Sequence, residues 1–131
     1  IAFIFEFFIF LNMNQKINKI IKYAKSIGFV EVKRSDYIHN KSTYYGLPEL
    51  PSHSWFMRLY PKGLGMALDI VNAVFISSEG IIETSNVKPY DEFRNYKYHL
   101  NGLLKKSRDL ILISKEKQIK QKIAEINKDF E

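Results

Sequence analysis

Residues 55–85 read WFMRLYPKGLGMALDIVNAVFISSEGIIETS, and the pattern of this stretch decides the fold. Two runs rich in β-branched and aromatic residues, 55–60 and 66–76, flank a short turn with Gly63 and Leu64 at its tip. Glycine at the first central position is what a two-residue type II′ hairpin turn requires. The stretch therefore predicts a β-hairpin around these two residues.

The hydrophobic pattern fixes the register of this hairpin. The turn pairs Met57 with Ile70 and Arg58 with Asp69, whereas a slip of one residue would set the arginine against the isoleucine. The predicted register gives the sheet one apolar face and one mixed face. The apolar face is expected to hold Trp55, Met57, Leu59, Leu68 and Ile70. The mixed face is expected to hold Phe56, Arg58, Tyr60, Ala67, Asp69 and Val71.

A second turn at 77–80 extends the sheet. Gly80 suits the left-handed position of a three-residue hairpin loop, which sets Ile76 opposite Ile82. The result is a three-stranded antiparallel meander, to which an alternating run at 29–34 adds a possible fourth strand.

Helices are predicted before and after this meander in the sequence. Residues 14–27 carry an apolar stripe of Ile17, Ile20, Ile21, Ala24 and Ile27, and Gly28 follows as a stop signal. Residues 89–131 are also helical in pattern, with Pro89 and an acidic pair at the expected entrance.

The C-terminal helical part carries two apolar stripes. The first consists of Leu100, Leu103, Leu104, Leu110 and Ile111, and the second of Ile119, Ile123, Ile126 and Phe130. At 100° per residue the second stripe is rotated by about 100° from the first. The sequence therefore predicts either a break near 113–114, with Ser114 as an N-cap, or one long helix that contacts two different bodies.

These elements define the fold class as α+β: an N-terminal helix, a three- to four-stranded antiparallel meander, and one or two C-terminal helices. The length of 131 residues is that of a single domain, which we assign to 13–131. Residues 1–12 are strongly apolar, and we expect them to lie outside the native fold, with Met13 as the start. The alternative is that they end a longer membrane anchor; otherwise no membrane span is expected, because the run is too short.

The charge distribution raises nucleic-acid binding as one hypothesis. Lysine and arginine total 20 against 14 acidic residues, and residues 94–122 alone carry a net charge of +7. Such a basic stretch attracts phosphates. The candidate contacts are Arg94, Lys97, Lys105, Lys106, Arg108 and Lys115. The abundance of lysine, asparagine, isoleucine and phenylalanine is also what an AT-rich genome would produce without any selection for binding.

Catalytic motifs are scarce in this sequence. There is no cysteine, and the three histidines, His39, His53 and His99, have no metal-binding spacing, so we expect no metal and no cofactor. A long loop is predicted at 35–54. The weakest functional hypothesis is an enzyme whose site lies in that loop and consists of His39, His53 and Tyr44.

The favoured hypothesis is a small cytoplasmic, non-enzymatic binding or accessory module. Aromatic residues that alternate with a basic residue can anchor a protein partner. The candidate binding residues are therefore Phe56, Arg58 and Tyr60, with Tyr44 and Tyr45 from the loop. The second docking candidate, for a protein partner or another copy of the chain, is the stripe that runs from Ile119 to Phe130.

Overall fold

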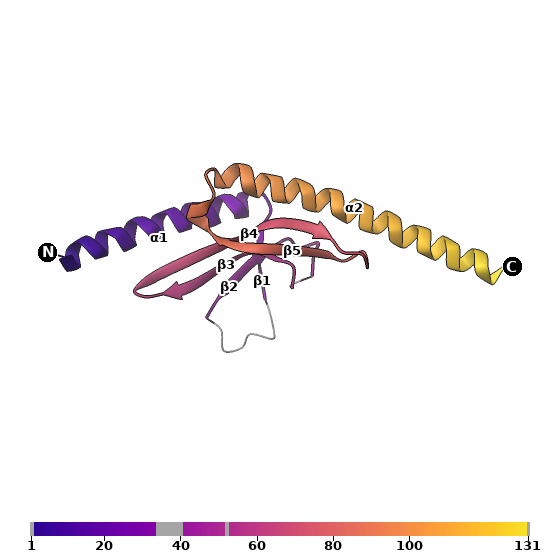
Figure 1. Cartoon of the computed structure of the whole chain (residues 1–131), viewed down its shortest axis with the longest axis horizontal. Coiled ribbons are helices and arrows are strands. Elements are labelled where there is room, and N and C mark those ends of the chain that lie inside the picture. The colour runs from indigo at the N-terminus through magenta and orange to yellow at the C-terminus, as the bar shows by residue number, and fades with distance from the viewer. Residues whose placement is uncertain (1, 34–40, 52, 131) are drawn as a thin grey trace.

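The chain folds into two helices and one antiparallel sheet in this computed structural model, which describes residues 2–33, 41–51 and 53–130 (Figure 1). Helix α1 (Ala2–Ser26) precedes the sheet, and a short 3₁₀ turn, η1 (Tyr90–Glu92), leads into helix α2 (Tyr96–Asp129). The strands are β1 (Val30–Val32), β2 (Thr43–Gly46), β3 (Trp55–Lys62), β4 (Gly65–Ile76) and β5 (Ile82–Pro89). The α+β class is confirmed.

The predicted meander register is confirmed at both turns. Met57 pairs with Ile70 and Arg58 with Asp69, while Gly63 adopts a left-handed φ of 60°. At the second turn Ile76 pairs with Ile82, and Gly80 has a φ of 82°. The pattern of buried side chains therefore specified the pairing of β3, β4 and β5.

The sheet has five strands, in the order β1-β2-β3-β4-β5, rather than three or four. The prediction of a loop throughout 35–54 is wrong, because residues 43–46 form β2 and pair with both β1 and β3. This strand is only four residues long, and its two central tyrosines give no alternation of apolar and polar residues. Pairing with β3 supplies the strand conformation that the local sequence does not signal.

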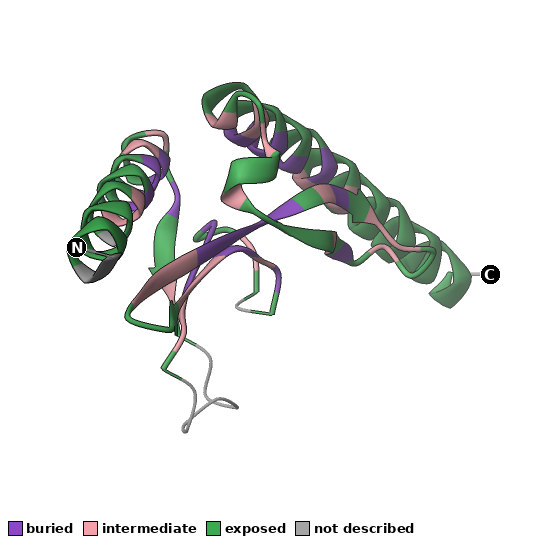
Figure 2. Cartoon of the chain, turned by 60° about the vertical axis from the view of Figure 1, so that its left-hand side comes forward, coloured by how far each residue is buried: buried purple, intermediate pink, exposed green. Residues whose placement is uncertain are grey.

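Both helices lie on the same side of the sheet and contact β4 (Figures 1 and 2). The predicted stripe of α1 is buried from Ile17 to Ala24, and the first stripe of α2 is buried from Leu100 to Leu110. They enclose the core with Met57, Leu68 and Ile70 of the central hairpin. Figure 2 shows that burial is concentrated where the helices meet the sheet and disappears towards their free ends.

The end of α1 is a Schellman motif. Gly28, with a φ of 119°, donates its N–H to the carbonyl of Lys25 at 3.2 Å, and Phe29 donates to the carbonyl of Ala24 at 3.0 Å. Glycine is required because an L side chain is strained at this φ. The motif turns the chain from α1 into the sheet and confirms Gly28 as the stop.

The beginning of α1 differs from the prediction. The helix was expected to start at residue 14, but it runs back to Ala2 through the apolar leader. The described side chains of residues 4–9 and 11 are exposed, and the core begins only at Ile17. The exclusion of residues 1–12 from the native fold stays a prediction.

The C-terminal part is a single helix, so the predicted break near 113–114 is wrong. The helix begins at Tyr96, where the Asn95 side chain accepts the N–H of Tyr98 at 3.2 Å, and Pro89 ends β5 instead of opening the helix. Ser114 is not an N-cap. Its hydroxyl donates to the carbonyl of Gly80 at 3.4 Å, so the helix passes the β4–β5 turn without interruption.

A β-bulge at the start of β3 exchanges two residues between the faces of the sheet. Tyr45 pairs with Met57 but Gly46 pairs with Trp55, which leaves Phe56 as the extra residue. A bulge breaks the alternation of side chains along the strand. Phe56 is therefore fully buried, with its ring 5.4 Å from Phe29. The predicted faces are wrong for Phe56 and Trp55: the phenylalanine enters the core, and the tryptophan joins the Arg58 side.

The bulge has a measurable consequence for stability. We expect Phe56→Ala to lower the free energy of unfolding by about 3–5 kcal/mol, because it leaves a cavity in a fully buried site. Urea denaturation followed by circular dichroism measures the change. The control is Phe75→Ala, since Phe75 of β4 is partly exposed and its truncation should cost less than about 1 kcal/mol. Equal losses in the two variants would contradict the assignment of Phe56 to the core.

Candidate functional site

An arginine held among aromatic rings lies on the sheet at the position of the predicted mixed face. The Nη2 atom of Arg58 donates to Oδ2 of Asp69 at 2.7 Å, which confirms the predicted cross-strand ion pair. The guanidinium carbon lies 4.7 Å from the centre of the Tyr60 ring and 5.9 Å from that of Trp55. The cation is thus bound electrostatically by one carboxylate and two π faces.

The local electrostatics keep this arrangement in one protonation state. The hydrogen bond to Asp69 raises the pKa of Arg58, so the guanidinium stays charged. Burial, together with the Asp69 carboxylate, raises the pKa of Tyr60, so its phenol stays protonated at neutral pH. The Asp69 carboxylate pairs with Nη2 of Arg58, whereas the buried Nε of Arg58 has no hydrogen-bond partner, so the arrangement is a cross-strand clamp that satisfies the guanidinium only in part.

The structure separates the other predicted binding residues. Tyr44 and Tyr45 are consecutive in β2 and take opposite faces. The ring of Tyr44 lies 5.1 Å from that of Trp55, whereas Tyr45 belongs to the core, with Lys25 Nζ 5.7 Å from its ring centre. Both tyrosines are buried, as is Phe56. Of the five predicted residues only Arg58 and Tyr60 are partly open to solvent.

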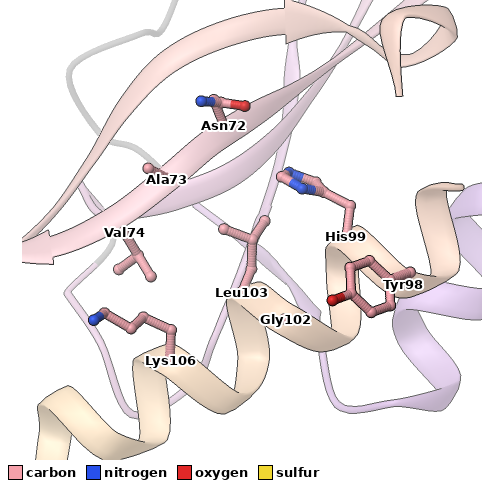
Figure 3. A pocket seen from close by; sticks show the side chains of 8 residues that line it. All are labelled: Asn72, Ala73, Val74, Tyr98, His99, Gly102, Leu103 and Lys106. Carbon is pink, nitrogen blue, oxygen red and sulfur yellow. The ribbon is translucent and has the colours of Figure 1, made fainter. Parts of the chain in front are cut away.

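A cleft opens between β4 and the first turns of α2 (Figure 3). Its volume is about 310 Å³. We call it the β4–α2 cleft; its lining residues are Asn72, Ala73, Val74, Tyr98, His99, Gly102, Leu103 and Lys106. No local sequence pattern signals this site, because its two halves lie more than 20 residues apart in the chain and only the packing of α2 on β4 brings them together.

His99 joins the two walls of this cleft. Its Nε2 atom lies 2.8 Å from the carbonyl oxygen of Val71, and its ring stacks on Phe93 at 4.1 Å. A carbonyl oxygen only accepts, so Nε2 carries the proton and donates. The bond satisfies a carbonyl of a fully buried residue and fixes the first turn of α2 on β4.

A second cavity of about 350 Å³ lies between α1 and η1. It is lined by Lys16, Lys19, Ile20, Tyr90, Asp91, Phe93 and Tyr96. Burial and the neighbouring Asp91 raise the pKa of Tyr90, which keeps its phenol protonated.

The six predicted nucleic-acid contacts are all exposed, with Arg94 just before α2 and the other five on it. At 100° per residue Lys97, Arg108 and Lys115 fall within about 20° of one another, so they form one line along the helix. Lys105 lies beside that line, and Lys106 lines the β4–α2 cleft on a different side.

The second apolar stripe of α2 has no cover in the described part of the chain. Ile119, Ile123, Ile126 and Phe130 are between 52% and 87% exposed, and every residue from 115 to 130 is exposed. The last fully buried residue of the helix is Leu110. Figure 1 shows this part of α2 running past the end of the sheet.

The structure gives no support to the enzyme hypothesis. His39 lies outside the described residues, His53 is exposed, and Tyr44 is buried against Trp55. Neither His53 nor Tyr44 lines either of the two cavities described above. Within the described ranges no group of three or more acidic or histidine side chains could hold a metal ion.

No helix in the described part of the chain has the length and apolar character needed to cross a membrane. The chain matches no protein-family model, no curated protein and no solved structure.

The His99 contact predicts a specific loss of stability. We expect His99→Ala to lower the free energy of unfolding by about 1–3 kcal/mol, because the buried carbonyl of Val71 loses its donor. Thermal or urea denaturation measures this loss, and the exposed His53 provides the matched control. If His53→Ala, expected to change stability by less than about 0.5 kcal/mol, proves as destabilising as His99→Ala, the anchoring role of His99 is wrong.

Proposed function

We propose that this chain is a small non-enzymatic binding module whose contact element is the C-terminal half of α2. The partner we infer is an α-helix of another protein with acidic side chains beside its apolar positions. The observation that carries the proposal is an apolar stripe that no other described part of the chain covers. The stripe lies on residues 112–130, and we call this segment the C-terminal arm. The stripe is formed by the exposed residues Leu112, Ile119, Ile123, Ile126 and Phe130.

The spacing of this stripe suits pairing with another helix. The steps between successive members are seven, four, three and four residues, as at the a and d positions of a heptad. At 100° per residue all five fall within about 60° of one another, the narrow strip that a single partner helix covers. A heptad assignment with Ile123 at position a leaves Glu116 as the one charged residue within the strip.

Burial of this stripe against a partner helix would stabilise the C-terminal arm. Beyond its contact with Gly80 the arm extends for 16 residues, 115–130, all of them exposed. Helices of this length are marginal in water and gain most of their stability from packing an apolar face. Burial of one isoleucine contributes about 1.5–3 kcal/mol, so a partner helix would stabilise the arm while binding it.

The flanking charges select the partner. Lys115 and Lys122 occupy g positions and Lys120 an e position of the same heptad, and Asp129, at the last g position, is the one acidic residue among the described flanking positions; all four are exposed. In a parallel pair, a second copy of the arm would bring Lys115 close to Lys120 of the other copy. Glutamates at the corresponding positions of a different helix would pair with them instead, and they would also direct the approach of the two proteins.

Two designed peptides test this proposal. Each has three heptads with leucine at d and isoleucine at a; one carries glutamate at every e and g position, and the other lysine. We expect the glutamate peptide to bind at least about tenfold more tightly, because like charges across an interface are repulsive. Fluorescence anisotropy with labelled peptide measures both affinities.

Matched variants locate the contact. Ile119→Ser with Ile123→Ser should abolish binding of the glutamate peptide and leave the unfolding transition unchanged, since both side chains are exposed. Ala124→Ser changes an exposed residue of the arm at the outer b position, away from the stripe and its flanks, and should have no effect. Equal binding of the two peptides, or none, would overturn the proposal. So would a dimer by light scattering that the double variant dissociates, because the occupant would then be a second copy.

Nucleic-acid binding is the second candidate, favoured by the line of exposed basic residues on α2. Lys97, Arg108 and Lys115 could follow a phosphate backbone, because three cations on one side of a helix add their fields. Phosphate contacts release counterions, so three of them predict a slope of about −3 for the logarithm of affinity against the logarithm of salt concentration.

A charge-matched comparison tests this candidate on duplex DNA and single-stranded RNA of mixed sequence. Replacement of those three residues by glutamine should remove most of the low-salt binding. Replacement of three exposed lysines of α1, Lys16, Lys22 and Lys25, removes the same charge elsewhere and should leave most of it. No binding at low salt, or equal losses in both variants, would eliminate the candidate.

A further inference from the structure

We propose that the β4–α2 cleft is a ligand site for a small carboxylic acid with an apolar body. This inference is independent of the C-terminal arm, which lies further along α2 and does not line the cleft. It depends on the composition of the cleft, on a glycine that keeps it open, and on a break in the sheet beside it.

The cleft combines an apolar floor with a few polar groups. Val74 and Leu103 are almost fully buried, and Figure 3 shows their side chains between β4 and α2, where they form the floor; Ala73 is also a lining residue. The polar groups at its rim are the side chains of Asn72, Tyr98, His99 and Lys106. An apolar surface with a small number of polar groups is typical of small-molecule sites, and about 310 Å³ lies at the lower end of their range.

Gly102 keeps the cleft open although the fold does not require a glycine there. It lies inside α2, and a Cβ atom built on it meets no atom within 4 Å. Glycine destabilises a helix interior by about 1 kcal/mol relative to alanine, and here no close backbone approach or left-handed φ accounts for it. Its effect is to leave space between the side chains of Tyr98 and Lys106, one turn before and one turn after it.

The β4–β5 ladder is interrupted beside the cleft. Val71 pairs with Val87 and Ala73 with Ser85, but the intervening pair of Asn72 with Asn86 is absent from the ladder. Asn86 has a φ of 55°, the one left-handed non-glycine residue in the described ranges. Backbone strain of this kind concentrates at ligand sites. Here it falls opposite Asn72, whose side chain belongs to the rim of the cleft.

The charge of the rim selects an anion. Lys106 is the one lining residue with a fixed positive charge, and no aspartate or glutamate is among the lining residues. Figure 3 shows the Lys106 side chain beside Val74, at the opposite end of the cleft from Tyr98, so the ammonium is the group placed to pair with a carboxylate next to the apolar floor. An alkyl or aryl body would lie on Val74 and Leu103, with the carboxylate directed towards Lys106.

Hexanoate is the probe. Hexan-1-ol and hexylamine are the controls, because they have the same six-carbon chain but a neutral and a positively charged head group. We expect hexanoate to bind with a dissociation constant of about 1 mM, as its eight heavy atoms permit. Binding should shift the NMR resonances of the Gly102 amide and of the Ala73 and Val74 methyl groups. Hexan-1-ol should bind more weakly, and hexylamine should not bind.

Three variants separate a site from unspecific adsorption. Gly102→Leu fills the cleft, favours the helix and should abolish the shifts while thermal stability is retained or raised. Lys106→Gln should weaken hexanoate binding about fivefold, whereas Lys105→Gln, the exposed neighbour outside the cleft, should change it less than twofold. The proposal is overturned if hexylamine binds as well as hexanoate, if the Gly102 variant still binds, or if no cleft resonance moves.

Discussion

The register between β3 and β4 is the constraint on which the rest of this structure depends. Met57 and Ile70 face each other in the interior, and Arg58 and Asp69 face each other across the same pair of strands. A shift of one residue would set Arg58 against Ile70 and Asp69 against Leu59, so the hydrophobic pattern favours the observed register. Because β4 also pairs with β5 and supports both helices, this register sets the position of every other element.

The helices use this platform to different extents. α1 packs with the stripe that ends at Ala24, and the Schellman motif at Gly28 then returns the chain to the sheet. α2 packs only with its first half, fixed by the bond from His99 to Val71 and by the row of leucines from Leu100 to Leu110. A helix of 34 residues is about 51 Å long, and β4 has only 12 residues to support it. The C-terminal arm is the part that extends beyond this support.

The two proposed sites have different physical origins. The arm is available because its apolar stripe is rotated from the one that meets the sheet, so a single straight helix cannot bury both on the same surface. The β4–α2 cleft lies where α2 crosses β4, beside a helical glycine, Gly102, and beside the interruption of the ladder at Asn72. The clamp of Arg58, by contrast, is a contact between neighbouring strands in which the guanidinium is already paired with the Asp69 carboxylate.

Local pattern alone determined the α+β class, the central hairpin, the stop at Gly28 and the two stripes of the last helix, because each depends on residue spacing and turn chemistry. Tertiary contacts decided what local pattern does not encode. The bulge that sends Phe56 into the core depends on how β2 meets β3, and β2 is held as a strand by its pairing with β1 and β3. The continuity of α2 past Ser114 and the meeting of Asn72 with His99 in one cleft likewise depend on packing between distant segments. Spacing along a chain records which side chains share a face, but not which distant surface that face will meet.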